Sequence, residues 1–224
     1  MNASPLFRSL ISILLLLFIC TSCKDRSSKG ASDAQQKDTT VGIISTVHSD
    51  PPQIPTTIER IRQLYDSTIT YLSEAKMDSV SFTYRCGDEK SGKISFYSYQ
   101  GTLRLITHKY HEYDHHHAED QFFTIDSILY FIFKSQTLWS FESGPDGSTK
   151  DDVTEHRTYL LNQKPVQCLK KEFVIHSESP GSINPKNGGS KNVTCPSNLV
   201  EEFKAIWSYR HETAHDCPEL KVKI

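Results

Sequence analysis

Two stretches of this chain contain residues with the types and spacing for metal chemistry. The first, His211-Glu212-Thr213-Ala214-His215, spells H-E-x-x-H. On a helix this spacing sets two imidazoles one turn apart to bind zinc, while the glutamate acts as general base toward a zinc-bound water. A catalytic zinc needs a third protein ligand, and beyond the flanking Asp216 only Glu219 follows as a carboxylate. The context therefore favours a plainer interpretation, in which His211 continues an apolar helix face past Trp207 and His215 lies at the fraying end.

The second stretch, His108 to Asp120, holds five imidazoles and four carboxylates. Histidine nitrogens and carboxylate oxygens bind Zn²⁺ or Ni²⁺, and the candidate ligands are His115, His116 and His117. Their spacing fixes no coordination geometry, and polar connections between strands are often rich in such residues for solubility alone. Clustered imidazoles could also sense pH, because they titrate near pH about 6.5.

Other kinds of chemistry have no motif. Beyond Cys23 the chain contains no G-x-S-x-G elbow, no phosphate-binding glycine loop and no C-x-x-C pair, so a serine hydrolase, a nucleotide enzyme and a thiol oxidoreductase are unsupported. The formal net charge is -2 and no basic cluster occurs along the chain, which disfavours nucleic acid as a partner.

The N-terminus reads as an export signal. Arg8 provides a positive start, and Leu10 to Cys20 is an eleven-residue apolar run interrupted only by Ser12. A helix of that length rises about 16 Å, whereas a bilayer core of about 30 Å needs about 20 residues. The run is therefore too short to span a membrane and is typical of a cleaved secretory signal.

The end of that signal resembles the lipobox of bacterial lipoproteins. In Ile19-Cys20-Thr21-Ser22-Cys23-Lys24, small residues precede a cysteine, although Cys20 stands where the family usually has an aliphatic residue. The resemblance implies cleavage before Cys23 and lipid attachment to it, and several acyl chains would hold the protein on a membrane of the cell envelope, in the periplasm or on the surface. The alternative is an ordinary secretory signal with a free Cys23.

The remaining chain divides into a tether and one domain. Residues 1–22 are the expected signal peptide, and residues 23–56 are rich in Ser, Lys, Asp, Gln and Pro, which predicts a flexible lipidated tether with an end-to-end distance on the order of 30 Å. Residues 57–224 suit a single domain by length.

The four cysteines of this domain are Cys86, Cys168, Cys195 and Cys217. We expect disulfides that involve Cys195 and Cys217, with buried free thiols at Cys86 and Cys168 as the alternative.

Helices are predicted at both ends of this domain. Thr56 and Glu59 form a capping box for a helix over about 57–76, whose apolar residues at helical spacing are Ile58, Ile61, Leu64, Tyr65, Ile69 and Leu72. A second helix follows Pro196 and reaches about His211, with Leu199, Val200, Phe203, Ile206 and Trp207 on its apolar face. The Gly-, Pro- and Ser-rich segment 177–193 between the sheet and this helix is expected to be a loop.

Between the helices an internal repeat predicts an antiparallel sheet. A strand over about 79–86 is followed by three segments in which an aromatic strand end, a two-residue polar turn and a second strand succeed one another. The turns are Gln100-Gly101, Asp126-Ser127 and Asn162-Gln163. The unit resembles the aromatic-Asn-Gly hairpins of exported bacterial proteins and variant MORN repeats. We therefore expect an α+β fold with a meandering antiparallel sheet of about seven strands from three repeated hairpins, packed by an N-terminal and a C-terminal helix.

The middle hairpin carries apolar residues on both faces. Alternation places Leu129, Phe131 and Phe133 on one side and Ile128, Tyr130 and Ile132 on the other, which predicts that both sides are covered. As a whole the sequence favours a non-enzymatic envelope lipoprotein that binds a protein, peptide or glycan. The alternatives are a zinc-dependent hydrolase that uses the H-E-x-x-H motif, and a structural or assembly role with no small ligand.

Overall fold

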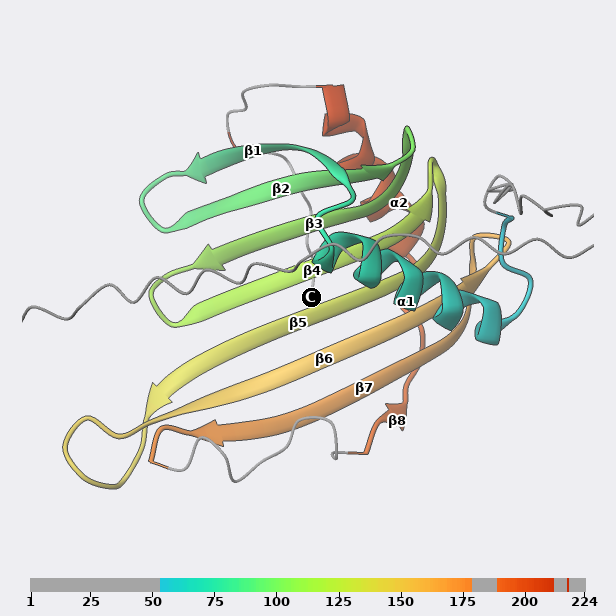
Figure 1. Ribbon diagram of the computed structural model, residues 1–224. Coiled ribbons are helices and arrows are strands. Elements are labelled where there is room, and N and C mark those ends of the chain that lie inside the picture. Colours follow the sequence, from blue (N-terminus) through green and yellow to red (C-terminus); the bar gives the residue numbers. More distant parts are fainter. Residues whose placement is uncertain (1–52, 179–188, 212–216, 218–224) are drawn as a thin grey trace, which may run out of the picture. The chain divides into compact units, whose positions relative to one another are not determined.

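The computed structural model describes residues 53–178, 189–211 and Cys217. The expected signal peptide, the lipid-attachment residue Cys23 and nearly all of the tether lie outside the described residues, as do Glu212 and His215. The described part forms an eight-stranded antiparallel sheet in which each strand pairs with the next along the chain, with one helix before it and one after it (Figure 1). The strands are β1 (Asp78–Cys86), β2 (Lys90–Tyr99), β3 (Thr102–Glu112), β4 (His116–Ile125), β5 (Ile128–Phe141), β6 (Thr149–Leu161), β7 (Lys164–His176) and β8 (Lys191–Asn192).

The predicted α+β meander is confirmed, but the sheet has eight strands rather than about seven. The missed strand, β8, is a two-residue segment that pairs with Leu169 and Lys170 of β7. It lies in the segment 177–193, which composition marked as a loop. Two residues are too few to show a period of two in the sequence, so this strand exists only because its partner is already in place.

The N-terminal helix α1 spans Ile58–Ser73. Its N-cap is Thr57, whose hydroxyl accepts a hydrogen bond from the Arg60 amide at 3.1 Å. The predicted capping box between Thr56 and Glu59 is therefore wrong by one residue, because the two adjacent threonines offer the same cap chemistry and the sequence alone does not choose between them. The predicted apolar stripe is confirmed, since Ile61 and Leu64 are buried against the sheet.

All three predicted hairpin turns form at the predicted residues. Gln100, Asp126 and Asn162 each occupy the first turn position with φ of 51°, 52° and 51°, the left-handed region that two-residue hairpin turns require. Each hairpin also has a register shift two residues before its turn begins, after Tyr97, Phe123 and Tyr159. The internal repeat therefore extends from the turn to a β-bulge at the same place in each copy.

The bulge in the middle hairpin changes which side chains share a face. Leu129 packs with Ile132 in one apolar cluster, while Tyr130 and Phe131 pack together in the other. Simple alternation had grouped Leu129 with Phe131, and that prediction is wrong because the extra residue at the bulge puts two consecutive side chains on one side. The prediction that both sides are covered is confirmed.

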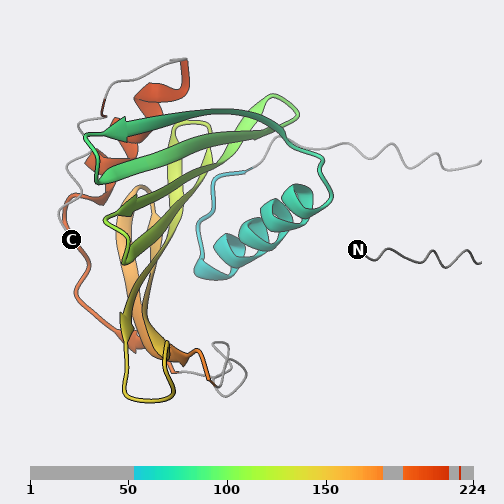
Figure 2. The same cartoon turned by 90° about the vertical axis from the view of Figure 1, so that its left-hand side faces the viewer.

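The two helices cover opposite faces of the sheet (Figure 2). Helix α1 packs on β5 and β6, and Tyr65 lies 4.9 Å from the ring of Phe123 on that face. Helix α2 (Leu199–Ser208) continues as a short 3₁₀ turn, Tyr209–His211, to the residue at which the helix was predicted to end, and it buries Leu199, Phe203 and Ile206 on the other face. We call the two sides of the sheet the α1 face and the α2 face.

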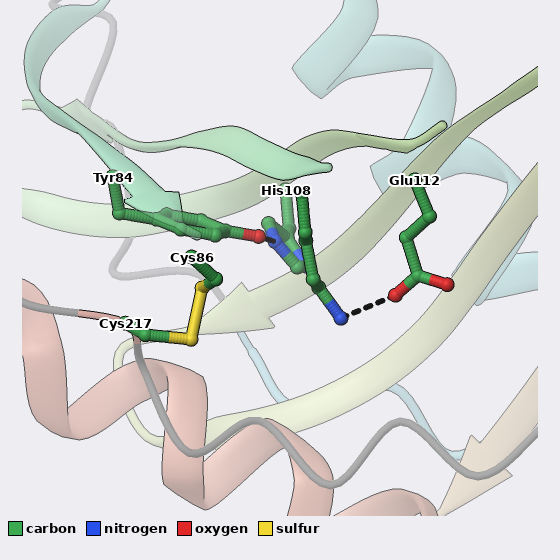
Figure 3. Close-up of a disulfide and its surroundings, with 6 residues drawn as sticks. Tyr84, Cys86, His108, Glu112 and Cys217 are labelled. Carbon is green, nitrogen blue, oxygen red and sulfur yellow. Dashed lines mark hydrogen bonds and ion pairs between the residues drawn. A yellow bond between two sulfur atoms is a disulfide. The ribbon is translucent and has the colours of Figure 1, made fainter. Parts of the chain in front are cut away.

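Two disulfides join the strands to the C-terminal part of the chain. Cys86 bonds Cys217, and Cys168 bonds Cys195 (Figure 3 shows the first). Disulfides that involve Cys195 and Cys217 are thus confirmed, and the alternative of buried free thiols at Cys86 and Cys168 is wrong. Side chains two positions apart on a strand point to the same face. Cys86 therefore shares the α2 face with Phe82 and Tyr84 of β1, and Cys168 shares it with Lys170 of β7.

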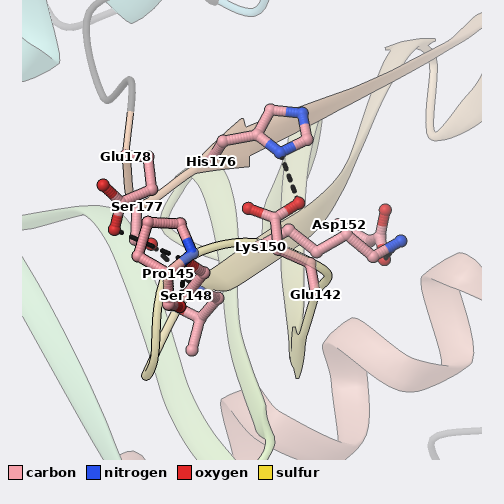
Figure 4. Close-up of polar contacts among 9 residues, drawn as sticks. Glu142, Pro145, Ser148, Lys150, Asp152, His176, Ser177 and Glu178 are labelled. Carbon is pink, nitrogen blue, oxygen red and sulfur yellow. Dashed lines mark hydrogen bonds and ion pairs between the residues drawn. The ribbon is translucent and has the colours of Figure 1, made fainter.

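The connection between β5 and β6 is closed by polar contacts (Figure 4). Ser148 donates a hydrogen bond to the Pro145 carbonyl at 2.7 Å, and His176 at the end of β7 lies 2.7 Å from the Glu142 carboxylate. These contacts fix the far ends of the long strands. Among the described residues no helix is long and apolar enough to cross a membrane.

Candidate functional site

A row of ionisable side chains crosses the α2 face on five neighbouring strands. The cross-strand partners are His108, Asp120, Lys134, His156 and Lys170, one from each of β3 to β7. Directly opposed residues have their Cβ atoms about 5 Å apart, so each member of the row is a neighbour of the next. The sheet register therefore assembles a polar row from residues that are 12 or more positions apart in sequence.

Lys134 lies at the centre of this row between two carboxylates. Its Nζ is 2.5 Å from Glu202 of α2 and 3.4 Å from Asp120. Burial lowers the pKa of Lys134, but the two neighbouring carboxylates outweigh burial and raise the pKa above its usual value. Burial raises the pKa of Asp120 to about 6, although Lys134 opposes that shift. Because a lone buried charge is costly, this ion pair and α2 hold one another in place.

His108 is fully buried next to this ion pair and is bonded to a tyrosine (Figure 3). Its Nε2 lies 2.6 Å from the hydroxyl of Tyr84. Burial lowers the pKa of His108 to about 3, so the ring is neutral. The ring of Tyr84 lies over Gly92 of β2 on its way to His108. A Cβ atom at position 92 would be only 2.5 Å from the tyrosine oxygen, so the absence of a side chain there makes room for the ring.

A cavity of about 250 Å³ opens between this polar row, the start of α2 and the segment 193–196. We call it the α2 cavity. Asp120, Lys134 and Glu202 supply its charged wall, and Ile132 and Leu199 are part of its apolar wall. The disulfide from Cys168 to Cys195 ties the covering segment to β7. Convergent polar groups in an apolar pocket are the usual setting of a small-molecule site.

The α1 face has a second concave surface, beside the helix rather than under it. It is a hollow of about 1010 Å³ over β1 to β5, and we call it the open face. Its side chains, which alternate with those that point to the α2 face, are Thr83, Arg85, Ser91, Lys93, Lys109, His111, His117, Glu119, Ser135 and Thr137. Among the described elements, α1 packs on β5 and β6 near the hairpin turns, whereas the open face lies at the other ends of β1 to β5, where no described helix packs.

The open face carries hydroxyls, imidazoles and an excess of positive charge. Lys109 is paired with Glu119 at 3.4 Å, whereas no carboxylate of the described residues forms an ion pair with Arg85 or Lys93. The Ser91 hydroxyl lies 2.7 Å from Nε2 of His111. Both of those side chains remain accessible, so the face presents hydrogen-bond donors and acceptors together with cations.

Aromatic rings lie at the end of the open face. The ring of Trp139 of β5 lies tilted against the ring of His115, with 3.9 Å between ring centroids, and 5.5 Å from the ring of Phe141. Phe141 is 70% exposed, and Tyr113 in the adjacent turn is 62% exposed. Exposure of Tyr97, Tyr99, Tyr110 and Tyr113 would favour binding, whereas their burial would favour a purely structural sheet. The structure divides them, because Tyr113 is exposed, Tyr97 and Tyr99 are half-buried and Tyr110 is buried.

The structure separates the three histidines that were the candidate metal ligands. His115 lies in the turn against Trp139, His116 is buried on the α2 face and His117 is exposed on the α1 face. The segment from His108 to Asp120 was expected to connect two hairpins. It belongs almost entirely to β3 and β4, with a turn at 113–115, so side chains adjacent in sequence point to opposite faces. No three His, Cys, Asp or Glu side chains in residues 53–178 and 189–211 gather as a metal site.

Only the start of the H-E-x-x-H motif is described. His211 ends the 3₁₀ turn after α2, and its Nε2 accepts a hydrogen bond from Nε of Arg210 at 2.7 Å. Its side chain is exposed, so the interpretation in which His211 continues the apolar helix face past Trp207 is wrong. Glu212 and His215 lie outside the described residues, and so does Cys23. The zinc site and the lipid anchor therefore remain predictions.

Sequence reasoning missed the polar row and the α2 cavity. Lys134, His156 and Glu202 belong to three separate elements, and the row appears only when the register of five strands is known. One signal was present in the sequence. Side chains two positions apart on a strand share a face, so Asp120, two residues before the buried Phe122, had to point inward as well. Such positions identify individual buried polar groups but not their partners.

Comparison of this chain with protein-family models, with curated proteins and with solved structures finds no match.

Proposed function

We propose that this chain is a lipoprotein of the bacterial cell envelope, anchored through Cys23, that acts as a binding module and not as an enzyme. We further propose that its ligand is an extended, negatively charged glycan that lies along the open face. The observation that carries the proposal is the half of the α1 face that no described element covers, where a large polar hollow ends in accessible aromatic rings.

The charge of the open face supports an anionic ligand. Arg85, Lys93 and Lys109 project from three adjacent strands, against one carboxylate, Glu119. The net charge of the chain is -2, so this excess of cations is a local feature. Exposed charges attract ligands over about 10 Å at moderate salt, and three such groups favour a polymer with repeated negative charges.

The other groups of the open face support a glycan over a folded protein. Hydroxyls and imidazoles of Ser91, His111 and Thr137 can both donate and accept hydrogen bonds, as sugar hydroxyls do. Trp139 and Phe141 supply ring faces and edges on which the apolar side of a sugar can pack. A protein partner would instead need an apolar centre with a polar rim, whereas the centre of this surface is polar.

The test measures binding of acidic and neutral oligosaccharides to the full chain in detergent. Fluorescence of Trp139 reports binding, because the only other tryptophan, Trp207, lies on the opposite face against Arg210. Galacturonate oligomers are the acidic probe and dextran oligomers of equal length are the neutral one. We expect the acidic probe to bind at least about tenfold more tightly and to weaken as salt rises.

A charge-neutralised variant and a matched control decide whether the open face is responsible. The variant changes Arg85, Lys93 and Lys109 to Gln and should reduce binding of the acidic probe by at least about tenfold. The control removes three exposed positive charges elsewhere: Lys164→Gln, Lys191→Gln and Lys204→Gln. Equal loss in both variants would mean that only net charge matters and would refute the site. Tighter binding of poly-glutamate than of galacturonate would show that the ligand is an acidic peptide.

The anchor is tested separately. Replacing Cys23 with Ala should move the protein from the membrane fraction to the soluble fraction, because the described residues contain no helix that could cross the membrane. A Cys23→Ala protein that still sediments with membranes would overturn this part of the proposal while leaving the binding result unaffected.

A further inference from the structure

We propose that the α2 cavity is a second binding site, for a small organic cation that carries a primary ammonium group on a short apolar body. This site lies on the other side of the sheet from the open face and does not depend on the glycan proposal. It combines a cavity, a deficit of positive charge and a buried acceptor without a hydrogen bond.

The charged groups around the cavity do not balance. Asp120 is 2% exposed, and the side chain of Glu202 is 9% exposed. Lys134 is the single ammonium that lies between them, so the three groups carry one net negative charge when both carboxylates are ionised. Buried charges in proteins are normally paired, and one further cation would complete the pairing.

The other cations of the row are occupied or neutral. Lys170 pairs with Glu172 at 2.7 Å, and Glu172 is largely exposed. Burial lowers the pKa of His156, with Lys170 and Lys134 acting in the same direction, so this imidazole is neutral at pH 7. Neither residue supplies the missing positive charge to Asp120.

One atom of Asp120 identifies where the ammonium group would lie. Oδ2 is buried and 3.4 Å from Nζ of Lys134, but it accepts no hydrogen bond from the described residues. Glu202, by contrast, accepts the hydrogen bond of that lysine at 2.5 Å. A primary ammonium group has three N–H donors and can satisfy Oδ2 without displacing Lys134.

The walls of the cavity determine the remainder of the ligand. Ile132, Pro196 and Leu199 surround the charged wall with apolar surface, which excludes a strongly hydrated ion and favours a hydrocarbon chain. At about 250 Å³ the cavity is smaller than the pockets of about 300–1,000 Å³ that hold drug-sized ligands. The ligand class is therefore a small amine and not a polyamine or a peptide.

Binding should depend on pH through Asp120. The groups that face this carboxyl are Lys134 from β5, His108 and Tyr110 from β3, and Glu202 from α2, with Glu119 next to it on β4. Its pKa of about 6 means that it is mostly ionised at pH 7.5 and mostly protonated at pH 5. A cation held at Oδ2 favours the ionised form and lowers that pKa, so its affinity should fall as the pH drops below about 6.

The test uses three probes of one shape and different charge with the full chain in detergent. Butylammonium, 1-butanol and butyrate are titrated at pH 7.5 and pH 5 while binding is followed by NMR. We expect butylammonium to bind at least tenfold more tightly than 1-butanol, and its affinity to fall at least threefold at pH 5. Binding of 1-butanol as tight as that of the amine, or no binding of the amine, would overturn the proposal.

Two matched variants locate the effect. Asp120→Asn keeps the shape of the side chain and removes its charge, so it should weaken butylammonium binding at least tenfold. Asp152→Asn, an identical change on β6 that does not line the cavity, should leave binding unchanged. Amine binding that survives Asp120→Asn would overturn the site. If that variant does not fold, the titration of Asp120 in the unchanged protein decides, because bound amine must lower its midpoint and an unmoved midpoint refutes the proposal.

Discussion

Gly92 lies beneath the ring of Tyr84, and we expect Gly92→Ala to destabilise the protein by disrupting the contact between Tyr84 and His108. An added Cβ would be 2.5 Å from the tyrosine oxygen, 2.6 Å from Cζ and 2.8 Å from Cε1, which is too close for any of these atoms. The ring would have to move away from β2. Its hydroxyl, now 2.6 Å from Nε2 of His108, would move with it.

The expected cost has two parts. Forcing one extra methyl group into a packed site costs about 1–3 kcal/mol. Leaving the buried imidazole of His108 without its partner costs about 1–3 kcal/mol more. Partial movement of the ring reduces both the packing cost and the hydrogen-bond cost. We therefore expect the free energy of unfolding to fall by about 2–4 kcal/mol, or the melting temperature by roughly 5–15 °C for a domain of this size.

Urea unfolding of four proteins tests the reasoning: the unchanged chain, Gly92→Ala, Tyr84→Ala and the double variant. If the contact with the ring is the cause, Gly92→Ala should cost less than about 1 kcal/mol once Tyr84 is alanine, because the space is then free. Tyr84→Phe isolates the hydrogen-bond part. An equal cost of Gly92→Ala in both backgrounds would refute the steric explanation and would indicate that the backbone at position 92 needs glycine for another reason.

Two further predictions concern the turns and the buried histidine. Gln163 has φ of 59° in the third hairpin turn, so Gln163→Gly should raise the free energy of unfolding by about 0.5–1 kcal/mol. The control, Lys164→Gly in the following strand, should lower it. A lower free energy of unfolding in both variants would contradict the turn assignment. The pKa of His108 falls from 6.5 to about 3 on folding because the ring is buried, so its contribution to stability is complete above pH 6.5 and is lost as the pH falls toward 3. Relative to His108→Gln, the unchanged protein should lose about 1.4 kcal/mol per pH unit below 6.5 in urea titrations, and parallel pH curves for the two proteins would refute this.

The features predicted correctly from the sequence are those that neighbouring residues determine. The turn at Asn162-Gln163 follows from residues that tolerate positive φ, and α1 follows from apolar residues one turn apart. Each pattern is complete within about twenty residues, so no distant contact is needed to interpret it. The eight-strand meander follows directly, because every strand in it pairs with its sequence neighbour.

The stretch from His108 to Asp120 shows why polar strands are harder to predict. It contains so many charged and imidazole side chains that composition indicated a connection, yet most of it is extended and paired. On the α2 face its inward residues include His108, Tyr110 and Asp120, which bond or stack with one another and with other elements instead of packing as hydrocarbon. Hydrophobic periodicity cannot detect a buried face that is itself polar.

The long strands divide into an apolar half near the hairpin turns and a polar half beyond it, and this division explains where both proposed sites lie. On β3, Leu105 and Ile106 lie in the two apolar clusters, whereas Lys109 belongs to the open face and Tyr110 to the α2 cavity. Helices need an apolar surface to pack on. They therefore pack their apolar sides over the first half on each face, while Glu202 of α2 reaches the polar row through Lys134.

The two proposed sites share strands, so the register of those strands keeps them apart. On β4, Glu119 belongs to the open face and Asp120 to the α2 cavity. A slip of one residue would exchange these two carboxylates and turn the whole strand over. The bulge after Phe123 and the tight turn at Asp126 fix that register from the apolar end. The repeated turn-and-bulge unit, which carries no functional side chain itself, is thus what assigns each polar residue to one face.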